Sequence, residues 1–475
     1  MITKNLMTIK SAVVLIFTGL ITLASCSKEG LNSNPTTAII DTSLNNLTFV
    51  SNPKNLNIVM FVPTDNPALN DYKPRLSQLL VYFQSWFHNE MKRYGFQKYL
   101  GLPKDLETGL VNIIEIPAAG KQEDYPYSSA VSANKIINEI KAYRILHPEK
   151  FSSENHYLIL LPQRTSGDTG QPFYGYGRYC FALDNQFMSV NHIPNPNSNY
   201  LGGMLHELGH GLNLPHNRAK YNSEAQQLGT SLMGSGNVSF SKGEPTFLTE
   251  VDAAILNVNE VFQNQENANP VYINPTFSIE PNFQIDQTNQ KLNITGTFTS
   301  NLEVNDILVY MDPNVNNEGI GVNKDYNAVA WRFNPGPNNT ISASLGLHEL
   351  FFKGETPYEV KVKLLLKNGI STSKTFDFIY KNDQLTSLEN VAFTYSNSTY
   401  SGTKGTLEVG NFTTADLVSK GIADNSISSI KIGQNIKVTL YDGDNFTGNN
   451  VVLNSSSTFL SNFNDRTSSI KIELK

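Results

Sequence analysis

The chain has 475 residues and a formal net charge of −6, with 36 basic and 42 acidic side chains. This length allows about three domains of ordinary size. The mild acidic balance, without any basic block, argues against nucleic acid as a partner. The only two cysteines, Cys26 and Cys180, cannot form a disulfide framework, so apolar cores must hold the domains together.

The N-terminal residues have the pattern of a secretion signal. Lys4 and Lys10 precede an apolar stretch over 12–24, which is too short for a comfortable transmembrane span and runs into Cys26. Residues 1–25 resemble a bacterial lipoprotein signal peptide, which implies that Cys26 becomes the lipidated first residue and anchors the protein to an envelope leaflet. The alternative is a plain secretory signal with a fortuitous cysteine.

Residues 27–29, Ser-Lys-Glu, resemble the surface-export signals of some Gram-negative lipoproteins. We therefore expect a bacterial cell-envelope protein on the outer membrane, exposed at the surface, with 26–52 as an Asn/Ser/Thr-rich tether. No later apolar run is long enough to cross a membrane, so we expect the remainder to be soluble. We also expect a monomer.

Strands and helices alternate in the next segment, 53–265. Apolar residues repeat at helical spacing in two segments that begin and end at helix signals, and β-rich apolar runs lie around them. Such an order implies right-handed crossovers and a mainly parallel sheet with helices packed on it, an α/β domain. The expected strands are 57–63, 110–116 and 156–161, and the expected helices are 74–94, 128–146 and 201–212.

The last of these helices carries the chemistry. His206 and His210 are four residues apart on one helical face, and Glu207 lies beside them. His216 follows Pro215, after the helix has ended, so three imidazoles can hold Zn²⁺ and leave its fourth position open for water. Glu207 is then the general base that takes a proton from this water as it attacks a carbonyl. A chance cluster of surface or core histidines is the weaker interpretation.

These residues resemble the metzincin clan of zinc peptidases, whose signature is HExxHxxGxxH followed by a methionine-containing turn, and they look most like its matrixin branch. Asn213 stands where the family has glycine, a mild change because asparagine tolerates positive φ. The resemblance implies that Met233 is the Met-turn residue beneath the metal. No tyrosine closely follows Met233, so the resemblance assigns transition-state stabilisation to zinc and to backbone groups of an edge strand.

The resemblance also assigns a substrate-binding edge strand to the Gly/Tyr/Phe-rich segment 170–183, for which an ordinary surface hairpin is an equal alternative. Cys180 within it is expected to be a small buried hydrophobic residue, and a zinc-ligating latency switch is the weaker alternative. A last helix is expected over 246–261, with Thr249 and Asp252 spaced as a capping box.

An Asn/Gln-rich stretch over 263–269 predicts a boundary, and 270–384 predicts a β-sandwich of the immunoglobulin-like kind. It would serve as a spacer or bind protein or glycan. The expected strands are 291–298, 307–310, 358–366 and 373–380, with Asn368-Gly369 as a hairpin turn.

The final segment, 388–475, contains a repeat in which 424–430 recurs as 464–470. It resembles a βγ-crystallin domain of two Greek-key motifs, whose signature forms paired calcium sites from hard oxygen ligands. The alternative is that these residues only cap turns. The resemblance implies the ligands Asp424, Asn425, Ser428, Asn464, Asp465 and Ser468.

Two function classes follow. The first is a surface-anchored zinc metalloendopeptidase that hydrolyses protein or peptide amide bonds, glycoproteins among them, with Ca²⁺ bound in the last domain. The second is a calcium-stabilised adhesin or glycan-binding lipoprotein with a vestigial metal site. The intact Glu207 favours the enzyme, because a relic site has no need of the base.

Overall fold

The computed structural model describes residues 49–164, 173–195, 200–266, 270–316 and 325–475. The predicted signal peptide, Cys26 and the tether up to residue 48 lie outside the described residues, as do residues 170–172 of the predicted edge-strand segment. None of the helices in these described ranges has both the length and the apolar character of a membrane span.

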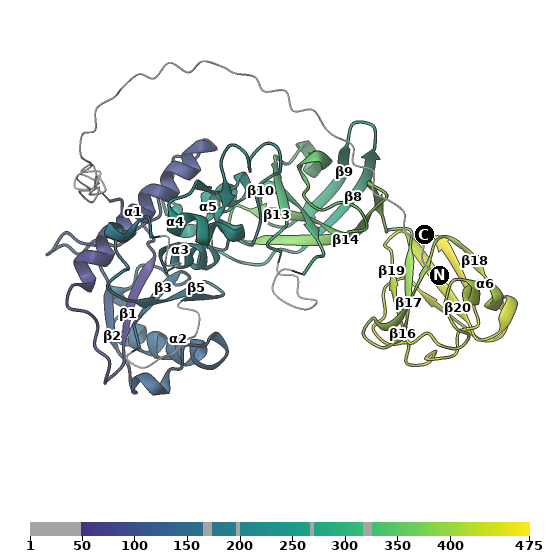
Figure 1. Cartoon of the computed structure of the whole chain (residues 1–475), viewed down its shortest axis with the longest axis horizontal. Helices are drawn as coiled ribbons and strands as arrows, with labels where there is room; N and C mark the ends of the chain where they lie inside the picture. Colours follow the sequence, from purple (N-terminus) through teal and green to yellow (C-terminus); the bar gives the residue numbers. More distant parts are fainter. Residues whose placement is uncertain (1–48, 165–172, 196–199, 267–269, 317–324) are drawn as a thin grey trace, which may run out of the picture. The chain divides into compact units, whose positions relative to one another are not determined.

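A five-stranded sheet forms the frame of the first domain, in the order β2-β1-β3-β5-β4 (Figure 1). Neighbours β2, β1, β3 and β5 are parallel, and β4 runs antiparallel to β5 at the edge, so a mainly parallel sheet is confirmed. The bounds are β1 Asn57–Val62, β2 Ile114–Pro117, β3 Tyr157–Pro162, β4 Phe173–Tyr176 and β5 Tyr179–Asp184.

The prediction of a strand over 110–116 was wrong at its start. The amide of Asn112 donates to the carbonyl of Pro103 at 2.7 Å, and Val111 bridges Lys104 in antiparallel register. These backbone groups are used in a local hairpin, so pairing with β1 begins only at Ile114.

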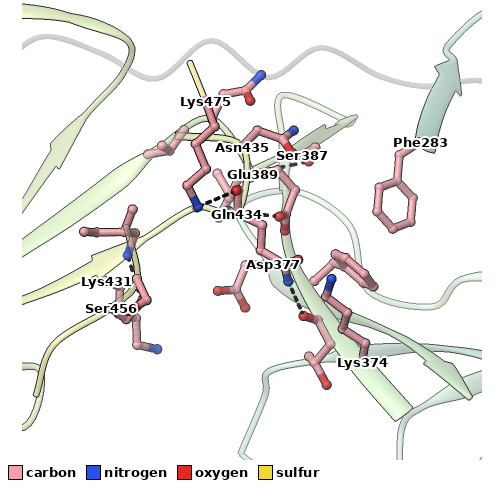
Figure 2. A pocket seen from close by; sticks show the side chains of 18 of the residues that line it. Phe283, Lys374, Asp377, Ser387, Glu389, Lys431, Gln434, Asn435, Ser456 and Lys475 are labelled. Carbon is pink, nitrogen blue, oxygen red and sulfur yellow. Dashed lines mark hydrogen bonds between the residues drawn. The ribbon is translucent and has the colours of Figure 1, made fainter. Parts of the chain in front are cut away.

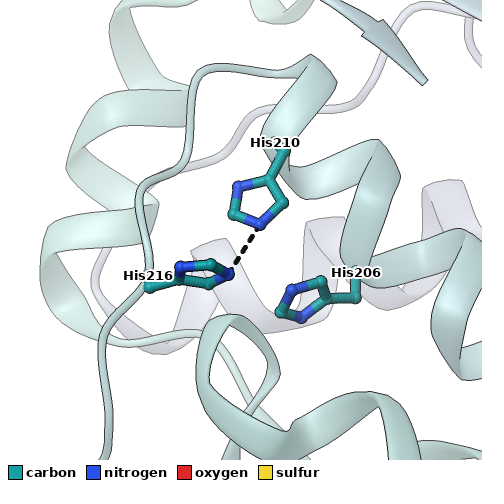
Figure 3. Close-up of side chains that lie close together, drawn as sticks. All are labelled: His206, His210 and His216. Carbon is teal, nitrogen blue, oxygen red and sulfur yellow. Dashed lines mark hydrogen bonds between the residues drawn. The ribbon is translucent and has the colours of Figure 1, made fainter. Parts of the chain in front are cut away.

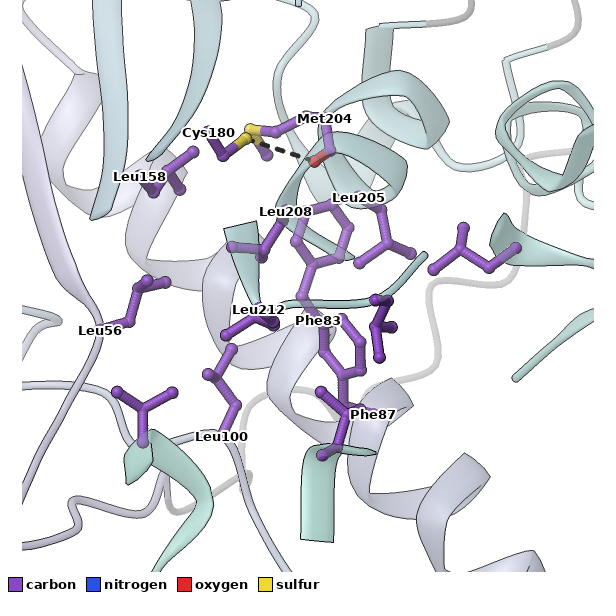
Figure 4. Packing of buried hydrophobic residues seen from close by; sticks show 14 of the residues in the cluster. Leu56, Phe83, Phe87, Leu100, Leu158, Cys180, Met204, Leu205, Leu208 and Leu212 are labelled. Atoms are coloured by element: carbon purple, nitrogen blue, oxygen red, sulfur yellow. Dashed lines mark hydrogen bonds between the residues drawn. The ribbon is translucent and has the colours of Figure 1, made fainter. Parts of the chain in front are cut away.

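Helices pack on both faces of this sheet. Alternate residues of β1 point to opposite sides, so Ile58 and Met60 join a core with α1 and α3, whereas Val59 and Phe61 join α2. Figure 4 shows the first core, where leucines of the histidine-bearing segment meet α1. The bounds are α1 Tyr72–Arg93, α2 Ser129–Leu146, α3 Tyr200–Gly211, α4 Asn237–Lys242 and α5 Glu250–Val258.

Helix α5 is shorter than the predicted 246–261. Thr249 has extended backbone angles and forms a capping box with Asp252, so the helix begins immediately after it. Residues 246–247 instead form β7 (Thr246–Phe247), which pairs in parallel with β6 (Thr230–Ser231). At the other end Asn259 has ψ 138° and caps a separate short turn, Glu260–Phe262.

Two antiparallel sheets form the second domain, in the orders β11-β10-β13-β14-β15 and β12-β9-β8, and one apolar cluster contains residues of both. All four predicted strands are present, but β8, β11, β12 and β15 were missed. Strand β8 shows why: it contains Pro281 and buries few of its side chains, so its apolar signal is weak. The bounds are β8 Phe277–Asp286, β9 Lys291–Ser300, β10 Val304–Pro313, β11 Val329–Phe333, β12 Thr340–Gly346, β13 Pro357–Leu366, β14 Ser371–Lys381 and β15 Gln384–Ser387.

The apolar core of the first domain continues into this second one. Leu308, Tyr310 and Ala330 of the sandwich belong to the same buried cluster as Val251 and Ala254 of α5. The polar stretch after α5 therefore marks a change of secondary structure, while the side chains on either side of it pack together.

The last domain consists of two small sheets, β17-β16-β19 and β18-β22-β20-β21, around one apolar cluster. Strands β19 and β22 each begin within the last two residues of one copy of the sequence repeat. The bounds are β16 Ala392–Asn397, β17 Ser401–Leu407, β18 Gly410–Phe412, α6 Thr414–Ser419, β19 Ser429–Ile432, β20 Ile436–Tyr441, β21 Asn450–Leu453 and β22 Ser469–Leu474.

Candidate active site

Three histidines meet at the end of α3 (Figure 3). His206 and His210 lie on this helix, which ends at Gly211, and the chain then reverses at Asn213 with φ 73°. The reversal returns His216 to the helix, so that one nitrogen of each ring lies within 4.8 Å of the others. The closest pair, His210 Nε2 and His216 Nε2, is 2.9 Å apart.

Backbone carbonyls orient two of these rings. His206 Nδ1 lies 2.7 Å from the Leu232 carbonyl, and His210 Nδ1 lies 2.8 Å from the Leu214 carbonyl. A carbonyl can only accept, so each Nδ1 carries the proton and each Nε2 turns its lone pair to the centre. Burial lowers the pKa of His206 to about 4 and that of His210 to about 3. Both rings are therefore neutral near pH 7, as metal ligands must be.

This donor set fits a divalent metal ion. Zinc holds imidazole nitrogens at about 2.0–2.1 Å in tetrahedral geometry, so two ligands of one ion stand about 3.4 Å apart. The nitrogens here lie within 4.8 Å of one another, so the widest pair can reach this distance when each ring moves inward by up to about 0.7 Å. Inward-facing lone pairs at this spacing repel one another unless a cation or a proton lies between them.

Glu207 lies between the helix and the edge strand of the sheet. A methyl group placed on Gly175 of β4 would stand 2.9 Å from Glu207 Oε2 and 3.4 Å from His210 Cβ. The backbone of β4 therefore passes directly over the carboxylate, an approach that only glycine allows. Phe173 of the same strand packs on Gly203 of α3, which places the strand along the helix.

Met233 lies beneath the histidines, in a turn over Leu232–Gly236. Its side chain is fully buried, and its sulfur would stand 2.5 Å from a methyl group placed on Gly209 of α3. The carbonyl of Met233 accepts a hydrogen bond from the amide of Asn217, next to His216. The turn thus supports both the helix and the returning loop.

One aromatic residue at the site, Tyr326 of the second domain, was not predicted from the sequence. Its ring stacks on His216 with centroids 3.7 Å apart and an interplanar angle of 27°. Tyr326 is 110 positions beyond His216, and no local pattern marks it. Only the packing of the sandwich against the first domain brings the two rings together.

A cavity of about 710 Å³ lies between the turn over Leu232–Gly236 and the sandwich, and Tyr326, whose ring stacks on His216, forms part of its wall. Arg218 forms part of its wall, where its guanidinium lies 3.4 Å from the centroid of the Phe351 ring and donates to Asn327 Oδ1 at 2.7 Å. Its polar lining comprises Arg218, Thr230, Ser231, Ser235, Asn237, Asn316, Tyr326 and Asn327.

Cys180 is fully buried on β5, and its thiol lies 3.8 Å from the Met204 carbonyl. Burial raises the pKa of this thiol well above its usual value, so it stays protonated. A protonated thiol held in the core is a packing residue, as predicted from the sequence.

In the last domain the two copies of the repeat exchange contacts. Ser468 Oγ donates to Asp424 Oδ1 at 2.7 Å, and Ser428 Oγ donates to Asp465 Oδ1 at 3.1 Å, so each copy contributes to both pairs. Within the described part of the chain, Asn464 Oδ1 is one of the few buried side-chain oxygens without a hydrogen-bond partner. Asn425 and Asp465 have positive φ of 53° and 52°.

A larger cavity, about 880 Å³, lies far from the histidines, where the sandwich meets the last domain (Figure 2). Its polar groups bond one another: Lys475 Nζ donates to the Gln434 carbonyl at 2.7 Å, and the Gln434 amide donates to Glu389 at 3.2 Å. Size alone does not make it the catalytic site, since it lacks the histidines and the base.

No family model matches the chain. A solved structure of OgpA from Akkermansia muciniphila, a catalytically inactive form with an O-glycopeptide substrate, is 31% identical; the match covers 72% of this chain and 97% of that one, with a TM-score of 0.64. Wild-type OgpA gives the same identity and TM-score over 71% of this chain.

Other relatives match a shorter part of the chain. Development-specific protein S of Myxococcus xanthus is 33% identical over 85 residues, which are 18% of this chain and 49% of that protein, so the match spans about half of its length. A βγ-crystallin domain from Flavobacterium johnsoniae is 34% identical over 18% of this chain and 96% of its own, with a TM-score of 0.18. The similarity to OgpA supports a hydrolase of the protease class, and the chain belongs to the same family as OgpA.

Proposed function

We propose that the chain is a zinc endopeptidase that cleaves O-glycosylated peptides or proteins. The observation that carries this proposal is the convergence of three inward-facing imidazoles with Glu207 beside them. OgpA, whose substrate complex contains an O-glycopeptide, supports the substrate class. A vestigial site in a binding protein would have no need for oriented ligands and an intact carboxylate together.

The residues divide the reaction between them. His206, His210 and His216 would hold the metal, which when bound would polarise the scissile carbonyl and activate a water. Glu207 would accept the proton of this water and pass it to the amine that leaves. The backbone of β4, at the edge of the sheet, would pair with the extended peptide and set its direction across the site.

The cavity lined by Tyr326 would take the sugar. Its volume of about 710 Å³ falls within the range of about 300–1,000 Å³ found for small-molecule sites. Its amide, hydroxyl and guanidinium groups match the alternating donors and acceptors of a glycan. An apolar side chain would leave these groups unpaired, which disfavours it.

Paired peptides test this proposal. One synthetic peptide is offered with and without an O-linked sugar on a single serine, to protein that is zinc-loaded, chelated, or chelated and then reloaded. We expect cleavage of the glycosylated peptide only, loss of cleavage on chelation and recovery with zinc. Equal cleavage of both peptides would contradict the proposed recognition of the sugar. Full activity after complete removal of the metal would contradict the proposed dependence on zinc.

Two further roles belong to the proposal. In the last domain, Asp424, Asn425, Ser428, Asn464, Asp465 and Ser468 would form a pair of calcium sites, which the crossed serine contacts and the orphaned Asn464 oxygen support. At the N-terminus, a lipid on Cys26 would anchor the enzyme at the outer face of a bacterial outer membrane, as the signal-like sequence suggests.

A further inference from the structure

Asn213 occupies the backbone position that reverses the chain between the second and third histidines. Its φ of 73° lies in the left-handed region, where glycine has no penalty and asparagine only a small one. The backbone alone does not require an asparagine side chain here. Its contacts are therefore informative: Asn213 Oδ1 accepts from Arg178 Nε at 3.2 Å, and the Arg178 guanidinium lies 3.9 Å from the centroid of the Tyr272 ring.

The Tyr272 side chain, on which Arg178 packs, connects this loop to the end of the histidine helix. It lies 2.6 Å from Nε2 of His156, and it accepts from the amide of Glu260 at 3.1 Å. Nδ1 of His156 lies 2.7 Å from the carbonyl of Gly211, the last residue of α3. His156 is fully buried, and burial lowers its pKa to about 3, so the ring is neutral.

The direction of each hydrogen bond in this network follows. The Gly211 carbonyl can only accept, so the single proton of His156 is on Nδ1, and Nε2 accepts from the Tyr272 hydroxyl. The phenol oxygen also accepts from the Glu260 amide, so Tyr272 is held by a donated and an accepted hydrogen bond. A hydrogen-bond network that is largely shielded from water is sensitive to the loss of one member.

The sandwich in turn holds Tyr272. The amide of Tyr272 donates to the Asn368 carbonyl at 2.9 Å, in the turn between β13 and β14. A methyl group on Gly369 of this turn would stand 2.5 Å from the Tyr272 ring. The Arg178 guanidinium lies 3.9 Å from the centroid of the same ring. Tyr272 is thus clamped between the two domains.

We propose that Tyr272 and Asn213 are positioning residues for the metal, which couple the sandwich to the loop that delivers His216. This inference rests on the proposed metal site. The network reaches both ends of the reversal, Gly211 before it and Asn213 within it, and so fixes the direction in which the chain leaves α3. The third imidazole depends on this direction, because it follows only three residues later.

The test measures zinc affinity in the full chain, by competition with a chromophoric chelator, and the visible spectrum of the cobalt-substituted protein. The variants are Tyr272→Phe, Asn213→Gly and the double variant. Tyr380→Phe is the matched control, because Tyr380 is also fully buried and, within the described residues, its hydroxyl has no hydrogen-bond partner. Asn213→Gly keeps the backbone conformation, so it carries the test if Tyr272→Phe does not fold.

Loss of an outer partner of a metal site costs about 10–100-fold in affinity, so we expect a fall of about this size in each single variant and a shifted cobalt spectrum. The double variant should lose less than the product of the two, since both changes break one network. Zinc affinity equal to that of the wild type in the single variants would overturn this inference without contradicting the proposed function. So would a double variant whose loss of affinity equals the product of the two single losses. A wild-type protein that binds no zinc would instead overturn the proposed function.

Discussion

Replacement of Gly175 by alanine tests whether Glu207 acts where the structure places it. The added methyl would stand 2.9 Å from Glu207 Oε2, closer than carbon and oxygen atoms normally approach. The carboxylate is the far end of a flexible side chain, so it can move aside by a few tenths of an ångström and the fold should survive. The movement displaces the proposed base from the water that it must deprotonate.

The expected loss is in catalysis rather than in stability. A displacement of about 1 Å at a catalytic group costs about 100-fold, so a smaller shift should lower kcat/KM by about 10- to 50-fold, or about 1.4 to 2.3 kcal/mol in the activation free energy. Zinc content and the unfolding temperature should stay near those of the wild type. The assay is cleavage of a fluorogenic O-glycopeptide, alongside metal analysis and a thermal scan.

Gly211→Ala is the matched control. A methyl at Gly211 would meet only Cys180 and Tyr179 atoms, at 3.4–3.8 Å, which is ordinary contact. We expect activity within about twofold of the wild type, because no catalytic group has to move. A fully active Gly175→Ala enzyme would refute the placement of Glu207 against β4, and equal losses in both variants would point to a general effect of alanine on α3 and its neighbours.

Three further outcomes are expected. Burial lowers the pKa of His156 from 6.5 to about 3, so its stabilising contribution is present above pH 6.5 and is lost as the pH falls towards 3. In metal-free protein, urea unfolding should show that the free energy of unfolding of His156→Gln depends less steeply on pH than that of the wild type, by up to about 1.4 kcal/mol per pH unit. Calcium should raise the unfolding temperature of the last domain in calorimetry, and Asp465→Ala should lower this increase; no calcium effect on the wild type would remove the calcium sites. Tyr326→Leu should weaken zinc binding up to about tenfold, because a ring pair contributes about 0.5–1.5 kcal/mol. Tyr326→Phe should keep most of the affinity. Unchanged zinc affinity in Tyr326→Leu would show that the stacked ring has no part in holding His216.

The sequence was informative where the signal is local. Two histidines four apart, a capping pair at Thr249 and Asp252, and alternating strands and helices each depend on near neighbours in the chain, and the parallel sheet and the α5 cap followed from them. The ends of elements were less certain, because competing partners decide them, as the Pro103–Asn112 hydrogen bond does for β2.

The rest could not be read from local patterns. Tyr326 and Tyr272 reach the site only because the sandwich packs on the first domain, and nothing near either residue in the sequence marks this contact. Asn213 was expected to be a mild replacement for glycine, which its φ of 73° supports, but its side-chain hydrogen bond depends on Arg178, in the turn between β4 and β5. The strands β8 and β12 bury only one of ten and three of seven side chains, so they lack the continuous apolar run of β10.

The central claim is that Glu207 is the base of a metal-dependent peptidase. Its most direct test compares the hydrolysis of an O-glycopeptide by the wild type and by Glu207→Ala, both with measured zinc content. The account predicts zinc near one per chain in both proteins and a rate at least about 100-fold lower in the variant, the lower bound for a general base. A Glu207→Ala protein that retains zinc and cleaves at the wild-type rate would contradict it.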